Sequence, residues 1–474
     1  MSPDAPRRVS LLAGTVLVIV GISVADAVVA AKSPSSRAVP PAAAIVADAA
    51  ASSSVWYCPG PAAAPTGSHA TVLLTNSGSR AAPGTLSTTT PGGARSAQQF
   101  VVPPATQLIL PVPLAAVEVV LHGGEVGAVQ QVTGPLGASA APCSSSTSST
   151  WYFGHGSTAG GAGLQVALFN PLPTPAVVDL SFVAPSGAAP VVPPAYQGVP
   201  LAPGAVAVEN IADHVPGNGS LAPVVEALSG SVVATEMQEA GTTPNSGLSL
   251  VDGAVRLASQ WSFAANSNGP GLVFTVVNPS DHAVSVTAAV ALLQGRATPL
   301  ALQIPAQSSV TLASQSQTRI PPGAIFGITF TGSRGAGIVV ARQVAGGVPF
   351  PQNALTAGQP GGIRRWLVPP MPPGQFAGDF AIVGLSGRPV HVTTAEIGPS
   401  GLQTAIPGQS RIALDPGALY FVVLQGGSAP IGIRPIIVEA DGPIALQLDP
   451  APPGTPGGEP VALWPLAPAL TPAG

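Results

Sequence analysis

The sequence predicts an all-β protein, with four tandem immunoglobulin-like antiparallel β-sandwich units after one N-terminal transmembrane helix. Three observations support this prediction. The 474 residues include 56 Gly and 56 Pro, which interrupt the chain too often for long soluble helices. Tryptophan begins four similar passages about 95 to 110 residues apart. An apolar segment lies close to the first residue. The length of the whole chain is typical of about three or four domains.

The apolar segment covers residues 9–25, which carry no charge and follow Arg7 and Arg8. A cleaved signal peptide usually has an apolar region of about 7–15 residues, whereas a membrane-spanning helix needs about 17–25. We therefore expect a cytoplasmic stub at 1–8 and a transmembrane signal anchor at 9–31. Because basic residues stay on the cytoplasmic side, the rest of the chain is predicted to be exported and to contact the membrane through this single span.

Two other outcomes remain open for this segment. Ala25-Asp26-Ala27 fits the small-x-small pattern of signal-peptide cleavage, which would remove the segment after Ala27. The paired arginines also fit a twin-arginine export signal. Residues 32–54 are rich in Ala, Pro and Ser and have no apolar period, so we expect an extended linker there.

The four tryptophan passages share the same spacing of turns. One turn follows each Trp after 17 to 20 residues, and a second follows after 33 to 35 residues. Between the two turns apolar and polar residues alternate, as they do from Val284 to Val290, which is typical of a half-buried strand. Six or seven such short strands per passage fit a two-sheet sandwich. The four residues are Trp56, Trp151, Trp261 and Trp366.

These repeats set the predicted domain boundaries. The sandwich units are expected at 55–145, 150–242, 258–346 and 363–450, and the Pro-rich residues 451–474 are expected to form an unstructured tail. Each tryptophan is predicted to fill the core of its unit, because a ring that buries about 200 Å² fills the space left by small Val and Ala side chains. A platform for stacking sugars is the alternative role for these rings.

The start of the first unit resembles a known family. The motif is Trp56-Tyr57-Cys58-Pro59-Gly60, followed by Trp151-Tyr152-Phe153 and the Asn170-Pro171 turn. It resembles a family of actinobacterial membrane-anchored exported proteins of unknown function, and the resemblance covers most of residues 50–450. A single lysine beside many arginines also fits the high-GC coding of such bacteria. The resemblance implies export and an anchor, but no activity, cofactor or catalytic residue. The third and fourth passages depart from the Trp-Tyr pattern, so equal roles for the four units are not implied.

Cys58 and Cys143 are the two cysteines of the chain, at the start and the end of the first predicted unit. In an oxidising exported compartment an even pair that brackets one unit predicts a disulfide. A metal or redox role is not indicated, because the spacing is not that of a close cysteine pair and no histidine cluster lies nearby.

No motif for catalysis, a cofactor or a metal emerges from the remaining residues. The histidines are scattered, without paired metal-ligand spacing, and each is expected in a turn or at the surface; they are His69, His122, His155, His214, His282 and His391. Residues Gly154 to Ala159 superficially fit a dinucleotide-binding glycine pattern, but we expect a strand and a turn after them rather than the required helix. We therefore read these glycines as a flexible loop.

Acidic residues also give no catalytic pattern. Glu118, Glu226 and Glu439 occur singly, whereas glycoside hydrolysis needs two carboxylates that face each other across a cleft. No Gly-x-Ser-x-Gly elbow of a serine hydrolase is present. The sequence thus predicts no catalytic residue, no bound cofactor and no metal, and the protein is not expected to be an enzyme.

The low content of charged residues excludes a further class of function. Only 16 basic and 20 acidic residues are present, about 8% of the chain, which leaves no basic patch for nucleic acid. The leading interpretation is a non-catalytic scaffold or interaction protein of the bacterial cell envelope, in the cell membrane with most of the chain extracytoplasmic. An envelope protein or a cell-wall glycan is the expected partner. The alternatives are an array of glycan-binding modules and an envelope enzyme with an active site between units.

Overall fold

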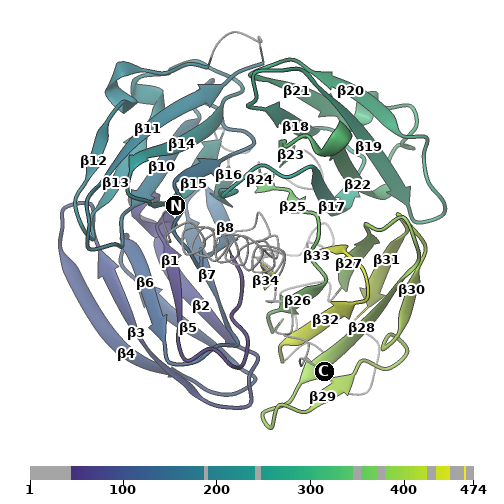
Figure 1. The fold of residues 1–474 in the computed structure, drawn as a ribbon, viewed down its shortest axis with the longest axis horizontal. Coiled ribbons are helices and arrows are strands. Elements are labelled where there is room, and N and C mark those ends of the chain that lie inside the picture. The colour runs from purple at the N-terminus through teal and green to yellow at the C-terminus, as the bar shows by residue number, and fades with distance from the viewer. Residues whose placement is uncertain are drawn as a thin grey trace, which may run out of the picture. The chain divides into compact units, whose positions relative to one another are not determined.

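A computed structural model describes residues 44–185, 190–240, 247–344, 354–370, 379–423, 434–448 and 464–465. These residues form antiparallel strands and short 3-10 turns, which confirms the all-β prediction (Figure 1). The turns are η1 (Gly60–Ala63), η2 (Pro194–Tyr196), η3 (Ile211–Asp213), η4 (Ser314–Ser316) and η5 (Ser333–Gly335). The predicted stub and anchor at 1–31 lie outside the described residues. In the part that is described, no helix has the length and apolarity needed to cross a membrane.

The first sandwich consists of two four-stranded sheets, ordered β1-β6-β3-β4 and β5-β2-β7-β8. Its strands are β1 (Ser54–Cys58), β2 (His69–Asn76), β3 (Ala82–Thr89), β4 (Arg95–Val102), β5 (Gln107–Val112), β6 (Ala116–Leu121), β7 (Val126–Gly134) and β8 (Gly137–Pro142). Residues just before β1 pack on this sandwich, since Ala44 and Val46 are buried and Glu125 N–H donates to the Ala47 carbonyl. The prediction of an extended linker at 32–54 is therefore wrong for residues 44–47, because the small apolar side chains of Ala44 and Val46 pack in the core.

The second sandwich repeats this arrangement, with sheets β12-β11-β14-β9 and β13-β10-β15-β16. Its strands are β9 (Thr150–Tyr152), β10 (Gly163–Phe169), β11 (Ala176–Val183), β12 (Val199–Leu201), β13 (Val206–Asn210), β14 (Ala222–Ser229), β15 (Val233–Ala240) and β16 (Gly247–Asp252). A strand thus follows the glycine-rich residues Gly154 to Ala159, as expected, so the helix that would hold a dinucleotide is not there.

The third sandwich has sheets β20-β19-β22-β17-β25 and β21-β18-β23-β24. Its strands are β17 (Gln260–Ser267), β18 (Leu272–Asn278), β19 (Val284–Leu292), β20 (Leu300–Ile304), β21 (Ser308–Ala313), β22 (Ile325–Gly332), β23 (Val339–Val344), β24 (Ala354–Ala357) and β25 (Gln359–Pro360). β19 contains the alternating residues Val284 to Val290, with the valines buried and Ser285 and Thr287 exposed.

The fourth sandwich has one sheet ordered β29-β28-β32-β26-β34, with β30 also paired to β28, and a second sheet ordered β31-β27-β33. Its strands are β26 (Arg365–Val368), β27 (Asp379–Gly384), β28 (Val390–Ile397), β29 (Gln403–Ala405), β30 (Ile412–Leu414), β31 (Leu419–Val423), β32 (Ile436–Ala440), β33 (Ile444–Leu448) and β34 (Trp464–Pro465). β34 pairs β26; the rest of the predicted tail at 451–474 lies outside the described residues.

The strand order distinguishes these sandwiches from immunoglobulin domains. In an immunoglobulin constant domain the first strand pairs the second. Here the first strands β1, β9 and β17 pair the sixth strands of their units, which are β6, β14 and β22, and β26 pairs β32. The sandwich architecture is shown, and the immunoglobulin-like strand order is not confirmed. The sequence repeat could locate the strands but not their partners, because pairing depends on contacts between residues far apart in the chain.

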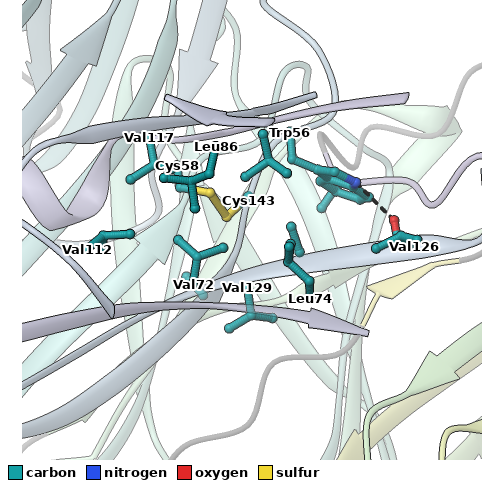
Figure 2. Packing of buried hydrophobic residues seen from close by; sticks show 14 of the residues in the cluster. Trp56, Cys58, Val72, Leu74, Leu86, Val112, Val117, Val126, Val129 and Cys143 are labelled. Atoms are coloured by element: carbon teal, nitrogen blue, oxygen red, sulfur yellow. Dashed lines mark hydrogen bonds between the residues drawn. A yellow bond between two sulfur atoms is a disulfide. The ribbon is translucent and has the colours of Figure 1, made fainter. Parts of the chain in front are cut away.

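The four repeated tryptophans lie on the first strand of each sandwich and are buried, with at most 2% of each residue exposed. Every indole N–H donates to a backbone carbonyl at or just before the start of a strand in the opposite sheet, namely β7, β15, β23 or β33. The bonds join Trp56 to Val126 (2.9 Å), Trp151 to Val232 (2.9 Å), Trp261 to Ile338 (2.6 Å) and Trp366 to Ile444 (3.4 Å). Figure 2 shows the first of these bonds beside the apolar core. Each tryptophan thus links the two sheets of its sandwich as well as filling space.

Buried asparagines explain the turn that follows β2, β10 and β18. The side-chain amides of Asn76, Asn170 and Asn278 donate to the carbonyl four residues ahead, at 2.7–2.8 Å. Each amide also donates to the end of the hairpin strand, for example from Asn76 to the Val102 carbonyl. One side chain therefore holds two loops together in three of the sandwiches.

Candidate functional site

Cys58 and Cys143 form a disulfide, which confirms the predicted pairing. Cys58 ends β1 and Cys143 follows β8, and both are fully buried in the core of the first sandwich (Figure 2). The backbones of Tyr57 and Ser144 exchange hydrogen bonds next to the bridge. The bond thus joins the first and last strands of this sandwich.

A cavity of about 420 Å³ lies where the first sandwich faces the second. Its floor is the outward face of the sheet β1-β6-β3-β4. Four residues are direct neighbours in a row across this sheet, and direct neighbours present their side chains on one face. They are Tyr57 on β1, Glu118 on β6, Ser87 on β3 and Ala97 on β4. The residues that line the cavity are Ser87, Thr88, Thr89, Arg95, Ser96, Ala97, Glu118, Phe169, Pro171 and Gly204.

The second sandwich supplies the opposite wall. Phe169 ends β10, and its ring meets the Tyr57 ring edge-on at 6.3 Å between centroids. The Arg95 guanidinium crosses between the sandwiches and donates to the Pro203 carbonyl at 3.0 Å. Glycine is favoured at position 204 because its φ is +67°, and an added Cβ would also displace the Arg95 guanidinium. These contacts fix the width of the cavity at this end.

Burial shapes the electrostatics of the cavity. It raises the pKa of the Glu118 carboxyl above its usual value. The pKa of the Tyr57 hydroxyl is also raised, first by burial and then by the neighbouring Glu118 charge. Ser87 and Thr89 lie on the same sheet face as this acid and Arg95, whereas the Thr88 and Ser96 hydroxyls bond each other at 2.8 Å. The cavity therefore offers hydrogen-bond donors and acceptors close to one apolar ring.

Consecutive sandwiches are also joined by hydrogen bonds from their last strands. The Ser139 hydroxyl of β8 accepts the Leu250 N–H of β16 at 2.8 Å. The Ser249 hydroxyl of β16 accepts the Leu355 N–H of β24, again at 2.8 Å. Ser139 and Ser249 are buried. The same serine-to-backbone contact therefore links the first sandwich to the second and the second to the third.

Two glutamine side chains join the third sandwich to the fourth. The Gln447 amide of β33 accepts the Ala265 N–H at 3.2 Å and donates to the Ala265 carbonyl at 2.8 Å. The Gln359 amide of β25 makes the reciprocal pair, accepting the Leu446 N–H at 2.8 Å and donating to the Leu446 carbonyl. β17 pairs β22 irregularly between Phe263 and Asn266, so the peptide groups of Ala265 are available to a neighbouring side chain.

Apolar residues complete these contacts. Met237, Leu248 and Leu250 of the second sandwich belong to the buried cluster of the first. Ala341 and Leu355 of the third belong to that of the second. Ala265, Val383 and Ala445 form a further cluster where the third and fourth meet. The same first cluster includes Leu367, Ile397 and Ile437 of the fourth sandwich.

Several polar groups are buried outside the cavity. Glu236 of β15 is fully buried and both its carboxyl oxygens have no hydrogen-bond partner, and this burial raises its pKa well above the usual value. Its direct neighbours Val166 and Val251 are core residues of the second sandwich. Burial likewise raises the pKa of Asp252 well above its usual value, although the Gly253 backbone hydrogen bond opposes this shift.

His155 contradicts the expectation that each histidine lies in a turn or at the surface. It is 5% exposed, and its Nδ1 lies 3.3 Å from the Ser220 hydroxyl and 3.4 Å from the Thr275 hydroxyl of the third sandwich. Burial lowers its pKa to about 4. The loop is held because the neighbouring Gly154 packs against the Ala341 backbone of the third sandwich.

Over the described ranges, no group of three His, Cys, Asp or Glu residues is placed to hold a metal ion.

The sequence did not identify the cavity residues as a group. The sequence singles out Glu118 only as an isolated acid and Tyr57 only as part of a motif, and it gives no signal for Arg95 or Phe169. One signal was present, because Thr85, Ser87 and Thr89 alternate along β3 and mark a polar outward face. Their meeting with Phe169 depends on the packing of two sandwiches, which local sequence does not encode.

Comparisons with known proteins do not identify a family. No protein family model matches the chain, and no curated protein matches it either. Among solved structures, the crystal structure of Thermotoga maritima 1070 has a TM-score of 0.20 and 16% identity, and the match covers 22% of this chain and 92% of that one.

Two longer matches are weaker. A Streptomyces avermitilis α-L-rhamnosidase complexed with L-rhamnose has a TM-score of 0.14 and 10% identity, over 85% of this chain and 55% of that one. A tetra-tandem repeat from the extending region of a large adhesion protein has a TM-score of 0.11 and 11% identity, over 77% and 92% of the respective chains. At these TM-scores the likenesses carry no conclusion about function.

Proposed function

We propose that the protein is a non-catalytic extracytoplasmic scaffold of the bacterial cell envelope, held to the membrane by its N-terminal segment. The observation that carries this proposal is the set of contacts between consecutive sandwiches. The serine and glutamine bonds to backbone groups join neighbours along the whole series. Sandwiches joined in this way keep their surfaces in fixed positions relative to one another, as a scaffold requires.

The surface composition supports the same function. The exposed strand faces carry Ser, Thr, Gln and Ala, and the whole chain is only 8% charged. A surface with few charges has a low cost of desolvation when it docks on another protein or on a glycan. Isolated exposed apolar residues, such as Leu228 and Leu402, add to this capacity.

The envelope location rests on the sequence alone. The uncharged residues 9–25 after Arg7 and Arg8 have the length of a membrane span. The disulfide is consistent with export, because such bonds persist in oxidising compartments. The resemblance to actinobacterial anchored proteins of unknown function points in the same direction.

Crosslinking in intact cells that produce the full-length chain tests this function. A scaffold is expected to give discrete adducts of constant mass with envelope components, from a photoreactive residue placed at Leu228 or Leu402. The same residue at buried Val225 serves as the control and is expected to give none. The chain is also expected to release no reducing sugar from isolated cell walls. Release of sugar at a catalytic rate, or the absence of adducts at both exposed positions, would contradict the proposal.

A further inference from the structure

We propose that the cavity between the first and second sandwiches is a binding site for a neutral carbohydrate. This inference goes beyond the scaffold function and does not depend on it. The cavity volume of about 420 Å³ falls within the range of roughly 300–1,000 Å³ that small-molecule sites occupy.

The lining matches the chemistry of a sugar ring. Ser87 and Thr89, on the same face of β3 as the Glu118 and Arg95 side chains, bring hydroxyls that both donate and accept hydrogen bonds, as the hydroxyls of a sugar also do. When it is ionised, the Glu118 carboxylate can accept hydrogen bonds from two adjacent hydroxyls of a sugar. Hydrogen bonds to a charged acceptor are stronger than those to a neutral one. Ala97 and Pro171 supply accessible apolar surface for the C–H groups of a sugar ring, and the buried Phe169 backs this wall.

The charges in the cavity favour a neutral ligand. Glu118 would repel an anion and Arg95 would repel a cation, whereas a polyhydroxylated ligand can use both groups. Arg95 keeps some donor capacity, because one of its nitrogens bonds the Pro203 carbonyl and a guanidinium has five N–H donors. Glu118 is the one carboxylate among the described lining residues, and hydrolysis of a glycosidic bond needs a second. Binding without cleavage follows from this lining.

The site is held rigidly from both sides. The outward row Tyr57, Glu118, Ser87 and Ala97 lies on four hydrogen-bonded strands. Phe169 is 3% exposed and packs with Ala116 and Val206 in a small apolar cluster between the sandwiches. A site held in this way loses little conformational freedom when a ligand binds.

Saturation-transfer NMR on the full-length chain tests the proposal. The protein is kept in a detergent without a sugar headgroup, because such a headgroup would compete. The probes are the methyl glycosides of glucose, galactose, mannose, arabinose and N-acetylglucosamine. The wild-type protein is expected to transfer saturation to at least one of these probes.

Two variants locate the binding. Ala97→Phe fills the cavity from an exposed strand position and is expected to abolish the transfer. Glu118→Gln removes the charged acceptor and is expected to weaken binding about tenfold. The matched controls are Ala301→Phe, exposed on β20 opposite Thr287, and Glu226→Gln, exposed on β14. Both controls are expected to bind as the wild type does.

The outcomes separate clearly. Transfer that is lost in Ala97→Phe and kept in Ala301→Phe, with equal melting temperatures, supports the site. No transfer to any of the five glycosides, or equal transfer in the wild type and Ala97→Phe, overturns it. Either result leaves the crosslinking test of the scaffold unaffected.

Discussion

Each repeated tryptophan has two roles in its sandwich, as a core side chain and as a hydrogen-bond donor between sheets. Its ring fills space among small residues, and its N–H donates to a carbonyl where a strand of the opposite sheet begins. The sequence predicted the first role from spacing, because a large ring among Val and Ala belongs in a core. It could not predict the second, which depends on the distance between two sheets.

Substitution of Trp261 separates these roles. Trp261→Ala is expected to destabilise the third sandwich by about 3–5 kcal/mol, because burial is lost and a cavity remains. Trp261→Phe keeps a ring but loses the donor to Ile338, and is expected to cost about 1–2 kcal/mol. Denaturant unfolding followed by fluorescence measures both changes. An unchanged midpoint in Trp261→Ala would show that the ring is not part of the core.

One position, buried in the first two sandwiches and half-buried in the third, differs in charge from sandwich to sandwich. Gln130, Glu236 and Arg342 each lie four residues after the carbonyl that accepts the tryptophan. Gln130 bonds Gly60 and Thr235, and Arg342 bonds Ala265 and Asn266. Glu236 alone of these three has no hydrogen-bond partner for its side-chain oxygens among the described residues.

Glu236 makes the stability of the second sandwich depend on pH. Its pKa is raised in the folded state by burial, above an unfolded value of about 4.3. Below the unfolded-state pKa the carboxyl is neutral in both states, and its contribution to stability is fully present. The free energy of unfolding then falls as the pH rises through the folded-state pKa, because the unfolded chain releases the proton more readily. Asp252, whose pKa is raised by burial as well, acts in the same direction.

Glu236→Gln tests this dependence. The wild-type melting temperature is expected to fall as the pH rises above about 4, and the fall is expected to be smaller in Glu236→Gln. Exposed Glu226→Gln on the same sandwich serves as the control and should follow the wild-type curve. Parallel curves for Glu236→Gln and the wild type would contradict the assignment.

At the scale of elements, alternating residues located strands well and their partners poorly. The alternation from Val284 to Val290 became β19, with its valines inside. The sequence could not predict that β1 pairs with β6 rather than with β2, because both candidate partners are apolar strands. The buried asparagines at the first turn also show why the turn position repeats, through bonds to a hairpin about 26 residues away.

The glutamine contacts between the third and fourth sandwiches can be tested locally. Gln447→Ala removes the acceptor for the Ala265 N–H, and hydrogen exchange at that amide is expected to become about three- to tenfold faster. Gln303→Ala, on exposed β20, is the matched control. Equal exchange at Ala265 in the wild type and Gln447→Ala would show that the contact does not form in solution.

At the scale of the whole molecule, the sequence predicted an all-β architecture of antiparallel sandwiches, but neither their strand order nor the contacts between them. Repeated tryptophans and turns are local signals, so they appear in the sequence. The residues that join the sandwiches cannot be distinguished by sequence from other polar strand residues, because their partners lie in the neighbouring sandwich. They are Ser139, Ser249, Gln359 and Gln447. The cavity beside Glu118 was unpredictable for the same reason, since its two walls come from different sandwiches.

Double electron–electron resonance tests the central claim, that consecutive sandwiches are held together, most directly. Both native cysteines are in the disulfide, so labels attach only at introduced cysteines. One pair, Gln99→Cys with Thr287→Cys, spans the first and third sandwiches, and Thr287→Cys with Thr311→Cys gives a reference within the third; all three positions are exposed on strands. We expect a single distance peak between sandwiches, about as narrow as the reference. A broad distribution, as for units on free linkers, would contradict the account.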